Sequence, residues 1–388
     1  MKIQRCSVLA ILPEQDVTFS LESLLAGGDG LCSAFHWRVY APHVGEVRQV
    51  NLDQLRLLGR LSPHWPSSID ALPADARAAC DELLAAGLLL SDDPRHRHWR
   101  ERDQTLRAMH WHPLAAIQQV FSRWQDVDSL ADMRQHKLET AEQIMAAHGA
   151  PPPETMAAVT SAEVLALPPV DGNDFDALLA RRSTCRNFDR ARDLPMAEFA
   201  RLLQRVFAVQ ATVEAVPGMR FVKKTSPSGG GLHPLEAYLL VQHVEGIAPG
   251  IYHYLAADHA LQVAAPLPEP DALLRGLAGQ DWFADAHVLV VMVARFERTF
   301  WKYRRHAKAS RVLALECGHL SQTLYLAATE VGLGAFITAA INEADWEQWL
   351  DLDPLQHGVL AVCGFGWRAD QMRHAEFDPL HKVWPAKR

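Results

Sequence analysis

The sequence lacks the features that mark several large classes of protein. With a net charge of −8, it has no excess of positive charge for a broad nucleic-acid surface. No apolar run reaches the roughly 20 residues that a membrane-spanning helix needs. Its six cysteines form no Cys-x-x-Cys pair, so neither a zinc site nor a disulfide framework is indicated. We therefore expect a cytoplasmic protein with reduced thiols and no metal, whose partners are neither nucleic acid nor membrane.

The length of the chain predicts two domains. At 388 residues it is too long for one typical core. Three consecutive prolines at 151–153 favour an extended linker over residues 151–170. We therefore divide the chain into an N-terminal domain of residues 1–150 and a C-terminal domain of residues 171–388.

The N-terminal domain has the order of elements that is found in winged-helix units. Short β-like runs come first, one of them at residues 6–12. Apolar side chains then recur at helical spacing over 52–61, a second helix over 74–86 ends before a glycine, and a strand begins at Leu88. This α/β domain resembles the winged-helix modules that bind peptides or DNA. An accessory domain that only packs is the alternative.

The C-terminal domain mixes helical and strand-like segments, which predicts an α+β fold. The expected helices are 175–182, 195–209 and 307–331, and two more at about 115–124 and 130–147 precede the linker. The expected strands are a hairpin within 250–263, a central strand within 285–294, and a strand over 358–366 that opens into a glycine turn. The run at 235–241 fits a buried helix or a strand. The 307–331 helix is apolar nearly all round, so we expect burial on several sides.

The stretch Thr225–Pro234, which we call the glycine loop, has three consecutive glycines between two prolines. Proline cannot donate a main-chain hydrogen bond, so both ends of the loop stay irregular. Glycine permits positive φ and lets a flat ligand approach the backbone closely. The loop is therefore suited to hydrogen-bonding a planar polar ring, and an ordinary glycine-rich turn is the alternative.

Residues 181–188, Arg-Arg-Ser-Thr-Cys-Arg-Asn-Phe, indicate a compact anion site, and we call them the arginine segment. Three arginines and two hydroxyls fall within six residues. Guanidinium groups bind phosphate through paired hydrogen bonds, and hydroxyls donate as well.

Four sequence features occur in the order of a known family. They are the arginine segment, Pro-Ser-Gly-Gly-Gly-Leu-His-Pro (227–234), Gly-Ile-Tyr-His-Tyr (250–254) and Lys-Tyr (302–303), the last followed by Leu-Glu-Cys-Gly-His (315–319) and Gly-Leu-Gly (332–334). On these features, residues 171–388 resemble the nitroreductase superfamily of flavin enzymes. Within it they are most similar to the SagB-type dehydrogenases, which mature ribosomally made peptides by oxidising thiazolines and oxazolines to thiazoles and oxazoles.

The resemblance implies a nitroreductase-like α+β fold, with a central mixed or antiparallel sheet flanked by helices, that holds FMN at the interface of a homodimer. The implied phosphate-binding residues are Arg181, Arg182, Ser183, Thr184, Arg186 and Arg368, and those beside the ring are Pro227, Ser228, Gly229, Gly230, Gly334 and Ala335. The family pattern has one residue between the hydroxyl and the second arginine. Here Thr184 and Cys185 both follow Ser183, so either Ser183 or Thr184 holds the hydroxyl role.

The chemistry of azoline oxidation asks for a base beside the flavin. The substrate loses a hydride, which flavin N5 accepts, and a proton from the neighbouring carbon. The resemblance implies that Lys302 and Tyr303 remove this proton, since a nearby ammonium lowers the pKa of a phenol. The alternative is that the pair only begins a helix. His319 and His233 are then the next candidates, unless they are satisfied core histidines.

Other functions on the same fold remain as alternatives. A general NAD(P)H-dependent nitro- or quinone reductase needs neither the N-terminal domain nor the Lys-Tyr pair, and no Gly-x-Gly-x-x-Gly loop follows a strand. A peptide dehydrogenase could also act on a non-azoline bond. A module that only binds a leader peptide or DNA would have a degenerate flavin domain. For the peptide dehydrogenase, the expected partners are a precursor peptide, a cyclodehydratase and a second copy of the chain.

Overall fold

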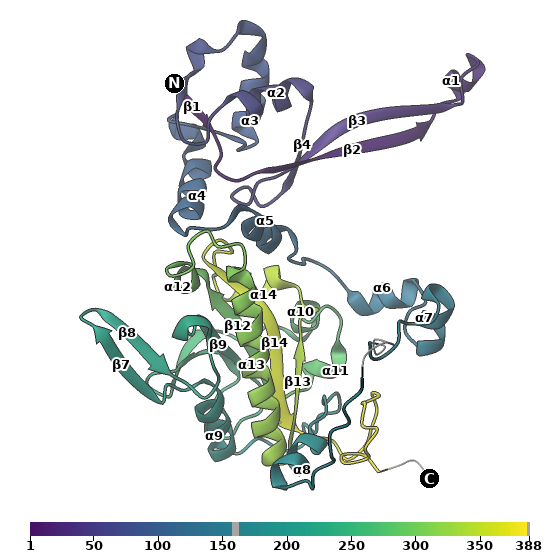
Figure 1. Cartoon of the computed structure of the whole chain (residues 1–388), viewed down its shortest axis with the longest axis vertical. Helices are drawn as coiled ribbons and strands as arrows, with labels where there is room; N and C mark the ends of the chain where they lie inside the picture. Colours follow the sequence, from purple (N-terminus) through teal and green to yellow (C-terminus); the bar gives the residue numbers. More distant parts are fainter. Residues whose placement is uncertain (157–162, 386–388) are drawn as a thin grey trace. The chain divides into compact units, whose positions relative to one another are not determined.

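The computed structural model describes residues 1–156 and 163–385 and divides into two compact units (Figure 1). The first unit comprises Met1–Arg123, Arg295–Leu313 and Leu352–Gly358, and the second comprises the rest of the described chain. The linker over 151–170 and the domain boundary there stay predictions. No helix within the two described ranges is both long and apolar enough to cross a membrane.

The first unit contains a small antiparallel sheet of order β5-β1-β6. Its strands are Ser67–Ser68, Lys2–Arg5 and Leu89–Ser91. Helices α2 (Leu52–Arg60) and α3 (Arg77–Ala85) occupy the predicted ranges, and Asn51 starts α2 with a reciprocal capping box. The core combines the apolar faces of these elements: Ile3, Leu57, Leu58, Leu83, Leu84 and Leu89. The order of helices and strand agrees with the sequence, and the winged-helix assignment stays a prediction.

A two-stranded ribbon extends from the first unit (Figure 1). β2 (Ala10–Phe19) pairs with β3 (Leu31–Tyr40), β4 (Val47–Val50) adds to the base of β3, and α1 (Leu21–Leu25) closes the far end. One face begins at the buried Val39 and continues outward as exposed apolar side chains, namely Val17, Phe19, Leu31 and Phe35. On the other face, Glu14 pairs with His36 and Arg38.

The expected strand at residues 6–12 is wrong in its first half. β1 ends at Arg5 and β2 begins only at Ala10, because the chain turns between them. The N–H and the hydroxyl of Ser7 both donate to the buried carboxylate of Asp103, each at 2.7 Å. This partner lies 96 positions further along the chain, so the apolar run alone does not reveal it.

Two more helices and a returning segment complete the first unit. They are α4 (Arg97–Ala108), α5 (Pro113–Phe121) and α12 (Phe296–Phe300). Trp111 joins them: its ring centroid lies 4.6 Å from that of Phe296 and 4.5 Å from that of Phe300. Its indole N–H donates to the carbonyl of Leu355 at 2.9 Å.

The second unit is organised around a six-stranded sheet of order β11-β10-β9-β12-β14-β13. The strands are β9 (Leu235–Val241), β10 (Gly250–Leu255), β11 (Ala260–Ala265), β12 (Val288–Arg295), β13 (Leu333–Thr338) and β14 (His357–Trp367). The predicted hairpin is β10–β11, the predicted central strand is the buried β12, and the ambiguous run at 235–241 is a strand. The predicted α+β fold with a central sheet is confirmed.

The second unit also contains several helices. They are α6 (Ser129–Gln135), α7 (Ala141–His148), α8 (Asp174–Arg181), α9 (Met196–Phe207), α10 (Pro270–Gly276), α11 (Asp281–Ala284), α13 (Ala309–Glu330) and α14 (Glu343–Trp349). The helix expected over 130–147 is broken into α6 and α7. Lys137 adopts φ +55° between them, and Thr140 caps α7 together with Gln143.

Helix α13 is less buried than its composition predicts. Cys317, Leu320 and Leu324 are buried, but Leu315 is 63% exposed, and small or polar residues continue the open side. The exposed or partly exposed stripe is Arg311, Ala314, Leu315, Gly318, His319 and Gln322. The prediction of burial on several sides is therefore wrong within this unit.

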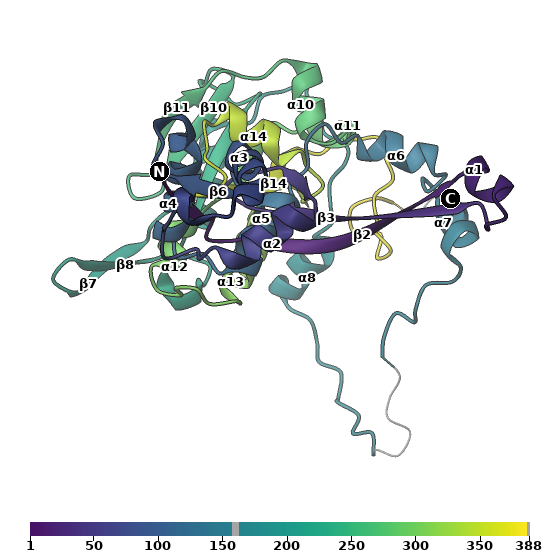
Figure 2. The same ribbon diagram turned by 90° about the horizontal axis from the view of Figure 1, so that it is seen from above.

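Glycines and a hairpin account for the remaining differences. Gly332 ends α13 at φ +79°, but Gly334 already lies in β13. Gly364 and Gly366 lie inside β14 rather than in a turn. Glycine is needed at both positions because a Cβ there would approach Phe336 and His287 to 2.3 Å. The sequence analysis also missed β7 (Ala211–Val216) and β8 (Met219–Lys223), a hairpin that projects from the unit (Figure 2).

Candidate active site

The arginine segment lies against the end of the sheet where β13 starts and β14 finishes. Thr184 forms a bridge with Ala335, and the N–H of Cys185 donates to the Ala335 carbonyl at 2.9 Å. Further on, Phe188 pairs with Arg368. The fold thus brings together three predicted stretches that are far apart in the sequence: the arginine segment, Gly334–Ala335 and Arg368.

Glycine is required at position 334 by this close approach. A Cβ added to Gly334 would lie 2.5 Å from Sγ of Cys185 and 3.5 Å from the Arg368 guanidinium. Cys185 is itself buried, and burial raises the pKa of its thiol to about 12. This thiol is therefore a packing group rather than a nucleophile.

Arg368 is held between a hydroxyl and a carboxylate. One guanidinium nitrogen donates to Oγ of Ser183 at 3.2 Å, and another makes an ion pair with Glu376. The Glu376 side chain is fully buried and also accepts from the N–H groups of Arg186 (2.6 Å) and Asn187 (3.1 Å) and from the Trp384 indole (2.8 Å). The Glu376 carboxylate therefore already occupies some of the hydrogen-bond donors of the arginine segment and of Arg368.

Arg182 and Thr184 of the arginine segment lie at Tyr325 on α13. The Arg182 guanidinium lies 5.3 Å from the centre of the Tyr325 ring, and Oγ1 of Thr184 is 3.0 Å from its hydroxyl. Burial raises the pKa of Tyr325, so the phenol stays neutral. Arg181 is exposed at the end of α8, and the Arg186 side chain donates to the Ala375 carbonyl at 3.3 Å.

The glycine loop contains a short 3₁₀ turn at Gly229–Gly231 in front of β9. Gly230 and Gly231 both adopt φ +69°, a conformation that favours glycine. His233 also has positive φ, at +45°, and is nearly buried. The loop is thus a fixed turn without side-chain bulk at its tip, as the sequence predicted.

Helix α13 holds the first half of the glycine loop. Ser226 Oγ lies 2.8 Å from Oγ1 of Thr323, and Nδ1 of His319 lies 3.3 Å from the Pro227 carbonyl oxygen. The Ser228 hydroxyl donates to the carboxylate of Glu316. Since His319 is exposed, it is not the core histidine that was considered as an alternative.

Lys302 and Tyr303 follow α12 and belong to the first unit. The Lys302 ammonium lies 5.6 Å from the centre of the Tyr303 ring. The Tyr303 N–H donates to the Thr299 carbonyl at 3.0 Å, which continues the turn of α12. The two side chains therefore lie close to each other. Their catalytic role stays a prediction.

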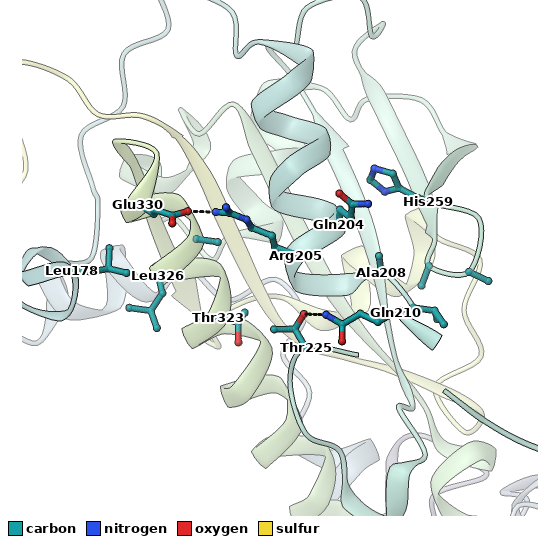
Figure 3. A pocket seen from close by; sticks show the side chains of 14 residues that line it. Leu178, Gln204, Arg205, Ala208, Gln210, Thr225, His259, Thr323, Leu326 and Glu330 are labelled. Atoms are coloured by element: carbon teal, nitrogen blue, oxygen red, sulfur yellow. Dashed lines mark hydrogen bonds and ion pairs between the residues drawn. The ribbon is translucent and has the colours of Figure 1, made fainter. Parts of the chain in front are cut away.

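A cavity of about 730 Å³ lies beside the start of the glycine loop (Figure 3). Its walls come from α8, α9, α13 and the β10–β11 turn: Leu178, Gln204, Ala208, Ala256, His259, Leu326 and Ala327. Arg205 and Glu330 form an ion pair across it, and Gln210 donates to Thr225 at 3.0 Å. The cavity shares Thr225 with the glycine loop but includes no residue of the arginine segment.

Sequence reasoning missed the residues that hold these segments, namely Glu316, Tyr325 and Glu376. Glu316 carried a usable signal, because it is a lone acidic residue amid the apolar positions of a long helix. Glu376 carried none, since it lies 190 positions after the main-chain group that it binds.

Several known proteins are similar to this chain. The profile of the nitroreductase family matches residues 179–367. The trifolitoxin-processing protein TfxB of Rhizobium leguminosarum bv. trifolii is 31% identical over 42% of this chain and 44% of its own. The microcin B17-processing protein McbC of Escherichia coli is 30% identical over 37% of this chain and 54% of its own. The chain thus spans about half the length of these curated relatives.

A solved structure supports the fold. The E. coli microcin synthetase McbBCD complex, with truncated pro-MccB17 bound, contains a chain that aligns with a TM-score of 0.51 at 22% identity. The alignment covers 69% of this chain and 94% of that chain. This likeness concerns the fold and extends beyond the residues that the family profile matches.

Proposed function

Because residues 179–367 form a nitroreductase-family domain, we propose that the protein is an FMN-dependent dehydrogenase of peptide maturation. In this proposal it oxidises azoline rings of a ribosomally made precursor peptide to azoles. Two relatives are named as processing proteins of trifolitoxin and microcin B17, which supports a peptide substrate. The observation that carries the proposal is the convergence of the arginine segment, Gly334–Ala335 and Arg368 at one end of the sheet.

Proteins of the nitroreductase family are flavin-dependent, and FMN is the flavin proposed here. The phosphate would be held by Arg181, Arg182, Ser183, Thr184, Arg186 and Arg368. Arg368 and Ser183 already share a hydrogen bond, and a guanidinium has donors to spare, so these residues fit an anionic group. The ring would lie against Pro227, Ser228, Gly229 and Gly230, with Gly334 and Ala335 near its reactive edge. Bound FMN would supply the acceptor for the hydride.

The proton of the oxidation is assigned to Lys302 and Tyr303. An azoline becomes an azole by losing one hydride and one proton, so a base must act together with the hydride acceptor. The proposed base is Tyr303, and the Lys302 ammonium lies 5.6 Å from the centre of its ring.

The proposed partners are a precursor peptide, a cyclodehydratase that makes its azolines, and a second copy of the chain, in the cytoplasm. The solved McbBCD complex holds a truncated pro-MccB17, which supports the first two. The exposed side of α13, with Leu315, Ala314 and Gly318, supports a helical dimer contact, because small and apolar exposed residues are typical of interfaces. The first unit is proposed to bind the leader part of the peptide.

The test begins with the purified protein. We expect a yellow protein whose heat-released chromophore migrates with FMN rather than FAD. A peptide that carries azolines should then lose about 2 Da for each ring oxidised, as one hydride and one proton leave. Rapid bleaching of the flavin by NADPH with no oxidation of the peptide would instead support a small-molecule reductase, and the absence of flavin would refute the proposal.

A further inference from the structure

Helix α13 and the glycine loop meet in register over three hydrogen-bonded pairs. Along the helix, positions 316, 319 and 323 stand on one side, at helical spacing. They contact consecutive loop residues in reverse order: Thr323 with Ser226, His319 with Pro227, and Glu316 with Ser228. Helix α13 therefore holds three consecutive residues of the glycine loop, each by its own side-chain contact.

Glu316 is the unusual member of this set, because its carboxylate is buried. The residue is 2% exposed, and two nearby residues of α13, Cys317 and Leu320, are buried and apolar. Burial raises the pKa of Glu316, while the hydrogen bond from Ser228, a main-chain N–H at Leu235 and the nearby charges of Lys224 and His319 lower it less strongly. A buried carboxylate usually costs more stability than an apolar residue of the same volume.

Ser228 connects this carboxylate to the tip of the loop. Its hydroxyl donates to Glu316 and at the same time accepts the N–H of His233 at 2.9 Å. The Ser228 carbonyl accepts the N–H of Gly231 at 3.0 Å. Both bonds close the turn in which Gly230, Gly231 and His233 have positive φ. Ser228 thus donates its hydroxyl proton to Glu316, so this proton is not available to a ligand on the side of the loop that faces away from α13.

We propose that Glu316 is the positioning residue of the glycine loop: its carboxylate orients Ser228 and so fixes the turn from Gly229 to His233. The ionised form holds the hydroxyl more firmly than the protonated form would, because hydrogen bonds to a charged group are stronger. The shape of the loop then depends on the charge of Glu316. The groups that face this carboxylate are Ser228, Lys224, His233 at 4.0 Å, and His319.

The consequence for a ligand rests on the proposed function, whereas the loop contact does not. If FMN lies on the loop, a negative charge beneath it opposes further negative charge on the ring. Replacing the carboxylate by an amide should then shift the midpoint potential of the bound flavin to more positive values. A purely structural role of Glu316 would not move this potential.

The test compares Glu316→Gln, Glu316→Ala and the matched control Gln322→Ala, an exposed position on the same helix. Amide hydrogen exchange is measured on flavin-free protein over a pH series. In Glu316→Ala the amides of Gly231 and His233 should exchange about 10- to 100-fold faster, while amides in β12 keep their rates, as in the control. Glu316→Gln should keep the protection near neutral pH, since its amide oxygen still accepts from Ser228.

The pH series separates positioning by charge from simple packing. After correction for intrinsic exchange, protection of the His233 amide in the unmodified protein should rise as Glu316 ionises. This rise should disappear in Glu316→Gln, which retains Lys224, His233 and His319. Unchanged loop exchange in Glu316→Ala, or an identical pH profile in Glu316→Gln, would overturn the proposal. Because no flavin is needed, such a result would be distinct from failure of the proposed function.

Discussion

Two buried glutamates lie beneath the two segments that the sequence assigns to cofactor binding, and their surroundings differ. Glu376, under the arginine segment, receives the Arg368 guanidinium, two main-chain N–H groups and an indole N–H. Glu316, under the glycine loop, receives the Ser228 hydroxyl and a main-chain N–H at Leu235, and the charges of Lys224 and His319 act on it less strongly. The first charge is matched by an opposite charge in contact with it, and the second mainly by neutral donors.

This difference indicates different roles for the same residue type. The Glu376 carboxylate, in contact with a guanidinium, holds the C-terminal segment against the arginine segment, and removing one partner of such a buried pair is strongly destabilising. Burial disfavours the charged form of a carboxylate that is held mainly by dipoles, and it raises the pKa of Glu316. The arginine segment is therefore expected to be static, and the glycine loop to respond to pH.

The largest expected effect comes from removing the Glu376 carboxylate. Glu376→Ala leaves Arg368 without its counter-charge and the N–H donors of Arg186, Asn187 and Trp384 without their acceptor, so we expect a loss of about 3–5 kcal/mol in the free energy of unfolding. Denaturant-induced unfolding measures it. Glu376→Gln is the control, since its amide still accepts hydrogen bonds and should lose less. Equal midpoints for Glu376→Ala and the unmodified protein would show that the comparison is wrong.

Residues outside both buried networks should affect the rate and not the stability. Tyr303→Phe keeps the ring and removes only the hydroxyl, so the oxidation of peptide azolines should fall on the order of 10²–10⁴-fold at unchanged FMN content. Mass spectrometry of the peptide measures the rate. Tyr252→Phe is a matched control, because this phenol donates to the Ala248 carbonyl and belongs to neither predicted site segment. Normal turnover by Tyr303→Phe would remove Tyr303 from the mechanism.

The contact between the arginine segment and β13 can be broken sterically. Gly334→Ala would place a Cβ 2.5 Å from Sγ of Cys185, and overpacking of this kind costs about 1–3 kcal/mol. Cys185→Gly removes the obstructing side chain and should restore part of the loss in the double variant, which a double-mutant cycle measures. Strictly additive effects would contradict the contact.

The smallest expected effect is the pH response of Glu316. Burial raises its pKa in the folded state, so the folded protein binds a proton at pH values where the unfolded chain has released it. Stability from this group is present below the ordinary glutamate pKa and is lost as pH rises through the raised value. The melting temperature of Glu316→Gln, relative to that of the unmodified protein, should therefore increase as pH rises. A constant difference across the series would exclude the linkage.

The sequence predicted those parts of the fold that depend on neighbours along the chain. The central strand at 285–294, the hairpin within 250–263 and the helix 307–331 follow from local apolar patterns. The glycines of 358–366 did not, because their reason is a facing side chain from a distant part of the chain. A local clue was overlooked at Pro217-Gly218, where φ +81° at the glycine turns β7 into β8.

In the candidate site, too, the contiguous segments could be predicted and the distant supporting residues could not. The glycine loop and the arginine segment are contiguous in sequence, so their composition revealed them. Their supports are not contiguous: Thr323, Tyr325 and Glu316 lie about 90 to 140 positions from the residues that they hold. Which polar side chain of a helix faces a distant loop is decided by packing, and a single sequence does not carry that information.

The ribbon of the first unit has a consequence for handling the protein in concentrated solution. β2 is an outer strand of ten residues beside exposed Val17 and Phe35, which is the kind of edge on which chains polymerise. Pro13 interrupts that edge because it has no N–H to offer, and the charges of Glu14 and Asp16 follow it directly. These residues oppose the addition of a further strand along β2, so we expect the ribbon to self-associate through its apolar face and mild detergent to disperse such contacts.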